Sequence, residues 1–202
     1  MIAIIDYGMG NLRSVEKAIR AVGGEALITS DIEDIRRADK VILPGVGAFG
    51  DCMKNLTERG LVPIIHETVA SGKPLLGICL GLQLFFESSE ESPGVKGLGI
   101  FEGEVKAIPP CGLKVPHMGW NSLTYCSPSP LYDGIAENEY VYFVHSFHAV
   151  PKDSSIITAQ TEYGTMLTAS VGRGNVQGAQ FHPEKSSRIG LMMLKNFVNG
   201  NE

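Results

Sequence analysis

The residues best suited to chemistry in this sequence lie at a strand-to-helix turn around Cys79. An apolar stretch from Leu75 runs directly into Gly77-Ile-Cys79-Leu-Gly81, a glycine–x–nucleophile–x–glycine pattern with sulfur as the nucleophile. The two glycines remove Cβ atoms that would collide at so sharp a turn, and the free N–H groups of the following helix favour the reactive thiolate. We therefore predict that Cys79 is a nucleophile rather than one more buried small hydrophobic residue.

A thiolate that attacks a carbonyl carbon needs a proton carrier, and histidine titrates nearest neutral pH. Among the five histidines, His182 has the best surroundings because the sequence continues through Pro183 to Glu184. Residues i and i+2 of an extended segment project to one side, and proline biases the preceding residue toward that geometry. We therefore predict that Glu184 holds one ring nitrogen of His182 while the other faces the thiol. His145 is the reserve candidate for the base, whereas His66, in a helix, is predicted to have no chemical role.

Attack on an amide carbonyl builds negative charge on oxygen, which hydrogen-bond donors must stabilise. One donor, the backbone N–H of Leu80, comes with the turn. The second should come from a loop after a neighbouring strand, where Pro44-Gly-Val-Gly47 offers the N–H groups of Val46 and Gly47. A simple tight turn explains this motif equally well.

The other three cysteines have no comparable setting. Cys52 lies on a predicted helix, Cys111 follows two prolines in a loop and Cys126 ends a strand, so we interpret them as structural or incidental. They form no Cys-x-x-Cys pair of the zinc or redox kind, and we expect neither a metal nor a cofactor. This cysteine usage indicates a reducing compartment.

Length and composition limit the function classes further. The chain has 202 residues, 44% hydrophobic and 19% charged, with a formal net charge of −5. These values fit one domain spanning residues 1–202, and the negative charge gives no sign of nucleic acid or an anionic membrane as a partner. The apolar run Pro74–Phe86 is too short to cross a bilayer, and Met1–Asp6 lacks the basic leader of a signal peptide, so we expect a cytoplasmic protein.

The elements that must position these residues alternate in type along the first half of the chain. Strands are predicted at 2–5, 26–29, 40–44 and 75–78. Helices are predicted at 12–22, 51–59 and 63–70, the first capped by Asn11, and a short helix is opened by Ser30 with Glu33. Further strands are predicted at 140–147, 156–161, 166–171 and 176–181, and a closing helix at 188–198. This order predicts an α/β fold: a three-layer sandwich with a central, mostly parallel sheet, helices on both faces and appended antiparallel strands.

The motifs 77–83 and 180–184 together resemble the triad-type glutamine amidotransferase family, and the resemblance covers nearly the whole chain. It implies that the enzyme hydrolyses glutamine to glutamate and ammonia. In this scheme Cys79 forms a γ-glutamyl thioester, His182 protonates the departing ammonia and Glu184 orients His182.

The same resemblance implies a set of substrate contacts. Gln83, one helical turn after the nucleophile, matches a position that contacts the bound glutamine. The backbone of His145, Ser146 and Phe147 matches the strand that holds the α-amino and carboxylate groups of the substrate.

Further segments resemble one branch of the family, whose members act in histidine biosynthesis beside a separate (β/α)₈ cyclase subunit. These segments are 6–11, 44–47, 116–121 and 182–186. The resemblance implies a heterodimer in which ammonia reaches the cyclase through an internal channel. It also implies interface residues, which are Asn11, Trp120, Tyr142 and Lys185. An acceptor docked over the site is physically reasonable, because ammonia free in water would be protonated and lost.

One position departs from the family, since most relatives have Pro-Gly-Gly where this chain has Pro-Gly-Val-Gly. Val46 lies between glycines that tolerate unusual φ angles. We hypothesise that the Val46 carbonyl rests toward the oxyanion site and that the peptide turns to present its N–H when the partner binds its nucleotide.

Three alternatives stay open. The chain could serve another synthase, such as one for anthranilate or pyridoxal phosphate, which would lack the segments around Trp120 and Lys185. A cysteine peptidase or esterase would share the turn, although α/β-hydrolases place the acid before the histidine in the chain. A non-catalytic binding module would need no combination of Cys79, His182 and Glu184.

Overall fold

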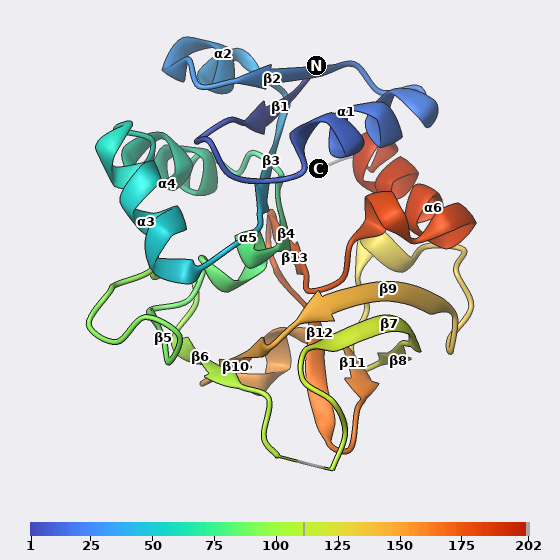
Figure 1. The fold of residues 1–202 in the computed structure, drawn as a ribbon. Coiled ribbons are helices and arrows are strands. Elements are labelled where there is room, and N and C mark those ends of the chain that lie inside the picture. The colour runs from blue at the N-terminus through green and yellow to red at the C-terminus, as the bar shows by residue number, and fades with distance from the viewer. Residues whose placement is uncertain (111, 201–202) are drawn as a thin grey trace.

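An eight-stranded mixed sheet forms the centre of the protein in the computed structural model, which describes residues 1–110 and 112–200 (Figure 1). The strand order is β2-β1-β3-β4-β13-β12-β11-β8. In that order the strands span Ala26–Thr29, Ile2–Ile5, Lys40–Gly45, Leu75–Cys79, Val176–Ala179, Met166–Arg173, Ile157–Glu162 and Thr124–Tyr125. Pairing is parallel from β2 to β13 and antiparallel from β13 to β8. The predicted α/β class, with antiparallel strands appended to a parallel sheet, is confirmed.

Helices cover both faces of this sheet and complete the three layers (Figure 1). One face carries α1 (Leu12–Ala21) and α6 (Ser187–Asn199), and the other carries α2 (Ile32–Arg37), α3 (Phe49–Glu58) and α4 (Val62–Ala70). The apolar run of β1 explains the arrangement. Ile4 packs into the core beneath α1 and α6, whereas Ile5 packs into the core beneath α2, α3 and α4, and both side chains are fully buried.

Two small sheets flank the main one. The first has the order β10-β6-β5, with bounds Phe147–Pro151, Gly103–Ala107 and Ser88–Ser89. The second pairs β7 (His117–Ser122) with β9 (Tyr140–His145), and both cross the front of Figure 1. The single strand predicted over 140–147 is therefore wrong, because the chain changes sheets at Ser146. Residues 1–110 and 112–200 also contain three 3₁₀ turns: η1 (Pro130–Tyr132), η2 (Ser154–Ile156) and η3 (Pro183–Lys185).

Helix starts differ from the predictions in three places. Asn11 precedes α1, but its side chain makes no capping hydrogen bond. Asp31 rather than Ser30 caps α2, since the Asp31 carboxylate accepts from two N–H groups of the first turn. Helix α3 begins two residues early, because the carboxylate of the distant Glu91 accepts from the Phe49 N–H at 2.8 Å. The prediction for Cys111 falls outside the described residues.

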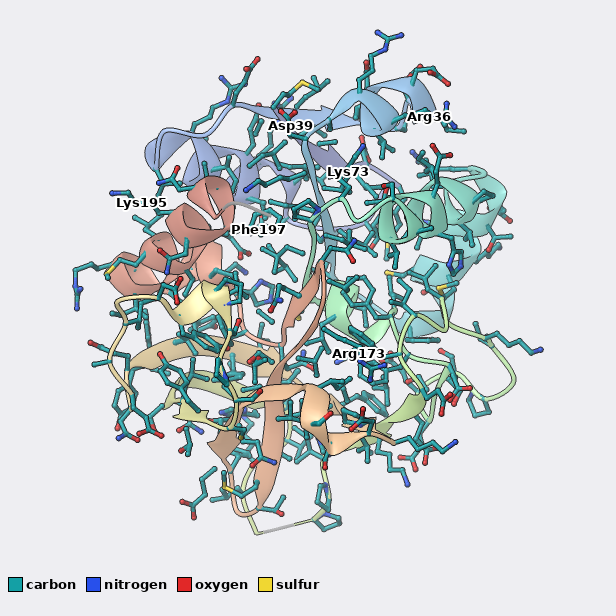
Figure 2. The ribbon with its side chains drawn as sticks, turned by 180° about the vertical axis from the view of Figure 1, so that it is seen from behind. Arg36, Asp39, Lys73, Arg173, Lys195 and Phe197 are labelled. Carbon is teal, nitrogen blue, oxygen red and sulfur yellow. The ribbon has the colours of Figure 1, made fainter. Side chains whose placement is uncertain are left out.

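The two edges of the parallel strands have different roles. Asp39 immediately precedes β3, and Lys73 lies two residues before β4, at the amino edge of the sheet, which is seen from behind in Figure 2. The Lys73 ammonium donates to the carbonyls of Ile35 and Arg36, which end α2, so these charges stabilise the scaffold. The carboxyl ends of β1, β3, β4 and β13 meet at the opposite edge, where the loops carry the predicted site residues. Among residues 1–110 and 112–200, no helix is both long and apolar enough to traverse a bilayer.

Candidate active site

Cys79 ends β4 in a strained backbone conformation. Its φ is 55° and its ψ is −111°, a left-handed region that non-glycine residues rarely adopt, and the short helix α5 (Leu80–Gln83) begins at the next residue. This backbone forms the sharp turn that the sequence predicts. The predicted helix after Cys79 is present but short, because α5 has only four residues.

The two glycines of the turn are required by close contacts with other segments. A Cβ on Gly81 would lie 1.9 Å from the carbonyl oxygen of Leu43 in β3, and a Cβ on Gly77 would lie 2.6 Å from the Phe85 ring. The missing Cβ atoms therefore let the turn pack directly against β3 and against the segment after α5.

His182 meets Cys79 from the far end of the chain. Its Nδ1 lies 2.8 Å from Glu184 Oε1, its other ring nitrogen is left to hydrogen-bond Cys79, and both His182 and Glu184 side chains are almost fully buried. Burial alone would lower the pKa of His182, but the hydrogen bonds and charges of Cys79 and Glu184 outweigh it and raise the pKa to about 9. The ring is therefore protonated at neutral pH, as a partner of a thiolate and a proton donor must be.

The local geometry after His182 differs from the prediction in one respect. Pro183 opens the 3₁₀ turn η3 instead of continuing an extended segment. His182 itself is extended, with φ −102° and ψ 96°, and the tight turn brings the Glu184 carboxylate back to its ring. The pairing of the two side chains is as predicted, whereas the extended backbone expected for it is wrong.

A cavity of about 320 Å³ opens beside the Cys79 sulfur. Its lining includes every predicted oxyanion and substrate residue, which are Val46, Gly47, Leu80, Gln83, His145, Ser146 and Phe147. The sequence analysis missed three further lining residues, which are Glu91, Pro116 and Val144. Of these, only Pro116 lies in a motif that the sequence had singled out.

The loop after β3 runs along one wall of this cavity. Gly45 is paired with Cys79 in the parallel register, so Val46 and Gly47 follow directly beside the nucleophile. The Val46 carbonyl lies 3.5 Å from the Cys52 sulfur, and Gly47 has a φ of 91°. Cys52 is fully buried on α3 and supports this loop from below. Whether the Val46 peptide turns over stays a prediction.

His145, the reserve candidate for the base, is engaged elsewhere. Its Nδ1 lies 2.8 Å from the Phe147 carbonyl oxygen and its Nε2 lies 2.9 Å from His117 Nδ1. Burial lowers the pKa of His145 to about 3 and that of His117 to about 4. Both rings are therefore neutral, and no nitrogen of His145 is left to accept a proton from Cys79.

The predicted interface residues surround the carboxyl edge of the sheet. Trp120 on β7 is directly opposite Tyr142 on β9, with their rings in edge contact and Trp120 half exposed. Lys185 is exposed in η3, and Asn11 precedes α1 after the loop that follows β1. The Tyr142 carbonyl accepts from the His182 N–H at 2.9 Å, so β9 is joined directly to the backbone of the candidate base.

No group of three or more potential ligand residues in the described part of the chain is arranged to hold a metal ion.

The fold and this site define a class of protein. The sequence pattern of the family Glutamine amidotransferase class-I matches residues 3–200, so the chain belongs to this family. Solved structures share the fold. They include PurLQS from Thermotoga maritima, with a TM-score of 0.77 and 21% identity over 98% of this chain and 97% of that chain. Another is described as a glutamine amidotransferase, with a TM-score of 0.74 and 19% identity over 96% of this chain and 99% of that chain.

Within the family, the chain is similar along almost its whole length to proteins named imidazole glycerol phosphate synthase subunit HisH. It is 55% identical to the HisH of Moorella thermoacetica over 196 residues, which cover 97% of this chain and 93% of the relative. It is 52% identical to the HisH of Methanothermobacter thermautotrophicus over 198 residues, which cover 98% of each. For the HisH of Aquifex aeolicus the identity is 51% over 195 residues, with 96% and 94% covered.

Proposed function

We propose that this chain is the glutaminase subunit of imidazole glycerol phosphate synthase. It hydrolyses L-glutamine to L-glutamate and ammonia, and a (β/α)₈ cyclase subunit uses the ammonia to make imidazole glycerol phosphate and aminoimidazole carboxamide ribonucleotide in histidine biosynthesis. The observation that carries the proposal is that the buried His182 ring interacts with both Cys79 and Glu184 beside the cavity. The high identity to HisH proteins supports the choice of synthase.

The reaction proceeds in two halves. The Cys79 sulfur attacks the side-chain amide carbon of glutamine, and the His182 imidazolium gives its proton to the departing nitrogen, which leaves as ammonia. The resulting γ-glutamyl thioester is attacked by water, whose proton passes to the now neutral His182. The carbon–sulfur bond then breaks, glutamate leaves and the Cys79–His182 pair is restored. Glu184 keeps the ring oriented and stabilises its charged form throughout.

Negative charge on the substrate oxygen is stabilised in each half by backbone donors. We assign these to the N–H of Leu80 and to the N–H of Val46 or Gly47, because all three residues line the cavity beside Cys79. Turning of the Val46 peptide would add or withdraw one of these donors. Loss of one such donor typically raises a barrier by about 2.7–4 kcal/mol, so this peptide could switch the rate strongly.

Substrate binding is assigned to the opposite wall of the cavity. Both N–H bonds of the Gln83 amide are used, toward the carbonyl of Phe147 and toward Gln180, so its oxygen is left to accept from the substrate. Glu91 also lines the cavity, and its negative charge suits the α-ammonium group of an amino acid. The backbone of residues 145–147 supplies further donors and acceptors.

The partner is expected to bind over β7 and β9. Met118, Trp120 and Tyr140 expose about half or more of their surface there, which is an unusual concentration of large apolar side chains. An acceptor docked at this edge would cover the cavity and receive ammonia away from water. We further propose that residues 1–202 act as one glutaminase domain and that the complex is a cytoplasmic heterodimer.

The proposal is tested by mixing this chain with a (β/α)₈ cyclase subunit and measuring glutamate release with and without the cyclase nucleotide. We expect the nucleotide to increase glutamine hydrolysis, Cys79→Ser to abolish it, and a γ-glutamyl-directed alkylating analogue to label Cys79. Equal rates with and without partner and nucleotide would refute partner control. Absence of labelling and hydrolysis would refute the glutaminase function.

A genetic test separates this synthase from the alternatives. The gene should restore growth of a strain that lacks its own histidine-pathway glutaminase and requires histidine. A working glutaminase that fails to do so would be the subunit of another synthase.

A further inference from the structure

A continuous series of hydrogen bonds joins strand β7 to the Cys79 sulfur. It begins at Asn121, whose Nδ2 lies 3.2 Å from His117 Nε2. His117 Nδ1 lies 2.9 Å from His145 Nε2, and His145 Nδ1 lies 2.8 Å from the Phe147 carbonyl oxygen. These contacts link residues of β7, β9 and β10.

The donor and acceptor of each hydrogen bond between Asn121 and the Phe147 carbonyl follow from the chemistry of the atoms. A carbonyl oxygen only accepts, so His145 Nδ1 must carry the proton that points at Phe147. Since the ring is neutral, its Nε2 is an acceptor, and His117 Nδ1 must then be the donor. His117 is neutral by the same reasoning, so its Nε2 accepts from the Asn121 amide.

The Phe147 carbonyl continues the series into the active site. It also accepts from Gln83 Nε2 at 2.9 Å, which fixes the nitrogen of that amide on this side. The same nitrogen donates to Gln180 Oε1 at 3.0 Å, and Gln180 Nε2 is then turned toward the Cys79 sulfur at 3.8 Å. The Phe147 carbonyl acceptor fixes the orientation of the Gln83 amide, and the Gln83 N–H donor then fixes the orientation of the Gln180 amide.

Packing holds this series rigidly. Gln180 is fully buried, and the His117 ring is stacked between Phe143 and Tyr163, with ring centroids 4.6 Å and 4.1 Å away. Gln180 and His182 stand two residues apart, and both contact Cys79. The sulfur therefore has two donors from one segment, of which only the imidazole is explained by the reaction.

We propose that Gln180 is a further catalytic residue, whose amide N–H stabilises the Cys79 thiolate. Gln83 is a positioning residue, which keeps the Gln180 amide from turning its oxygen toward the sulfur. His145, supported by His117, is a second positioning residue, which holds in place the Phe147 carbonyl that accepts from Gln83. The inference rests on the proposed glutaminase function and deepens it. A hydrogen bond to a charged group changes an equilibrium by roughly 10- to 100-fold, so the donor should favour the thiolate by that factor.

The first test replaces Gln180 with methionine, which has a similar length and no N–H. The folded protein is treated with iodoacetamide at a series of pH values, and mass spectrometry of the peptide that contains Cys79 measures how much has been alkylated. Glutaminase kinetics are measured on the full chain with its cyclase partner. We expect the pH midpoint of alkylation to rise by about one unit or more and kcat to fall at least about tenfold. An unchanged midpoint and kcat would overturn the catalytic role of Gln180.

The second test uses a matched pair at His117, outside the cavity. His117→Phe keeps an aromatic ring between Phe143 and Tyr163 but removes the donor to His145, whereas His117→Asn returns an N–H near the Nδ1 position. We expect the phenylalanine variant to shift the alkylation midpoint in the same direction, and the asparagine variant to recover most of the change. A phenylalanine variant with the wild-type midpoint beside a shifted asparagine variant would show that His117 acts through packing, and would overturn its positioning role.

These outcomes are distinguishable from failure of the proposed function. A wild-type chain without glutaminase activity or analogue labelling contradicts the function itself. An active wild-type chain, together with a Gln180→Met variant whose alkylation midpoint and kcat are unchanged, contradicts only the thiolate-stabilising role of Gln180.

Discussion

Replacement of Gly81 by alanine should abolish most of the glutaminase activity while the protein still folds. The added Cβ would lie 1.9 Å from the Leu43 carbonyl oxygen. Ordinary van der Waals contact between a carbon and an oxygen atom requires about 3.5 Å, so α5 and β3 must move apart by roughly 1.5 Å to accept the added Cβ. Neither side of this contact is a flexible side-chain end, because the oxygen belongs to the backbone of the sheet.

The displacement acts directly on the reacting groups. Residue 81 follows the Leu80 N–H, and α5 also carries Gln83, so both the oxyanion donor and a substrate contact move with it. Loss of one oxyanion donor costs about 2.7–4 kcal/mol in the barrier, which is a fall in kcat of about 100- to 1000-fold. Overpacking of this size costs about 1–3 kcal/mol in stability.

Glutamate-release assays measure the loss of kcat, and urea unfolding of the same samples measures the loss of stability separately. Gly24→Ala is the control, because its Cβ would lie 2.7 Å from the Ile19 side chain, in a clash at the opposite edge of the sheet. It should lose stability by a similar amount and keep its kcat. A folded Gly81→Ala variant with a kcat within a few-fold of wild type would refute the argument that this contact positions the turn.

Three further predictions concern charge and partner binding. Glu184→Gln removes a charge that raises the pKa of His182, so the alkaline limb of the kcat–pH profile should move to lower pH and kcat should fall about tenfold or more. The pKa values of His117 and His145, about 4 and 3, lie below those of the unfolded chain, so the unfolded state binds more protons and stability falls as the pH drops below about 6.5. Urea unfolding should show a loss of up to about 1.4 kcal/mol per pH unit for each ring, and His117→Asn should remove one such contribution. Trp120→Ala should leave the unfolding midpoint nearly unchanged, because the side chain is half exposed, and should weaken cyclase binding about tenfold or more in titration calorimetry.

Each of these predictions has a contradicting outcome. An unmoved alkaline limb in Glu184→Gln would mean that the carboxylate charge does not support the imidazolium. Equal pH slopes for wild type and His117→Asn would mean that His117 titrates normally in the folded protein. Unchanged cyclase affinity in Trp120→Ala would place the docking surface elsewhere.

Local patterns in the sequence were enough to predict the sharp turn at Cys79. The glycines on either side of Cys79 and the apolar strand before it are neighbours in the chain, so their meaning is readable without coordinates. The physical reason for Gly81 is not local, because the clash would involve Leu43, which is contributed by another strand. Sequence reasoning identified the required residue but could not name the contact that requires it.

Contacts between distant segments account for what the sequence did not predict. Glu91 caps α3 from 42 positions away, and Gln83 meets Gln180 across 97 positions, so no periodicity or short motif reports either pair. The turn after Pro183 shows the opposite case. Its local signal favoured an extended chain, but Pro183 opens a 3₁₀ turn, and the hydrogen bond of Glu184 to His182 forms across that turn.

The place of β13 in the sheet has a consequence for synthesis on the ribosome. This strand, Val176–Ala179, is made after the seven other strands of the sheet, yet it lies between β4 and β12 in the middle of it. A nascent polypeptide that already contains the sulfur therefore still lacks the segment bearing its imidazole. Chains that stop before this segment cannot release ammonia, so synthesis must pass it before the protein can consume a nutrient that many other enzymes share.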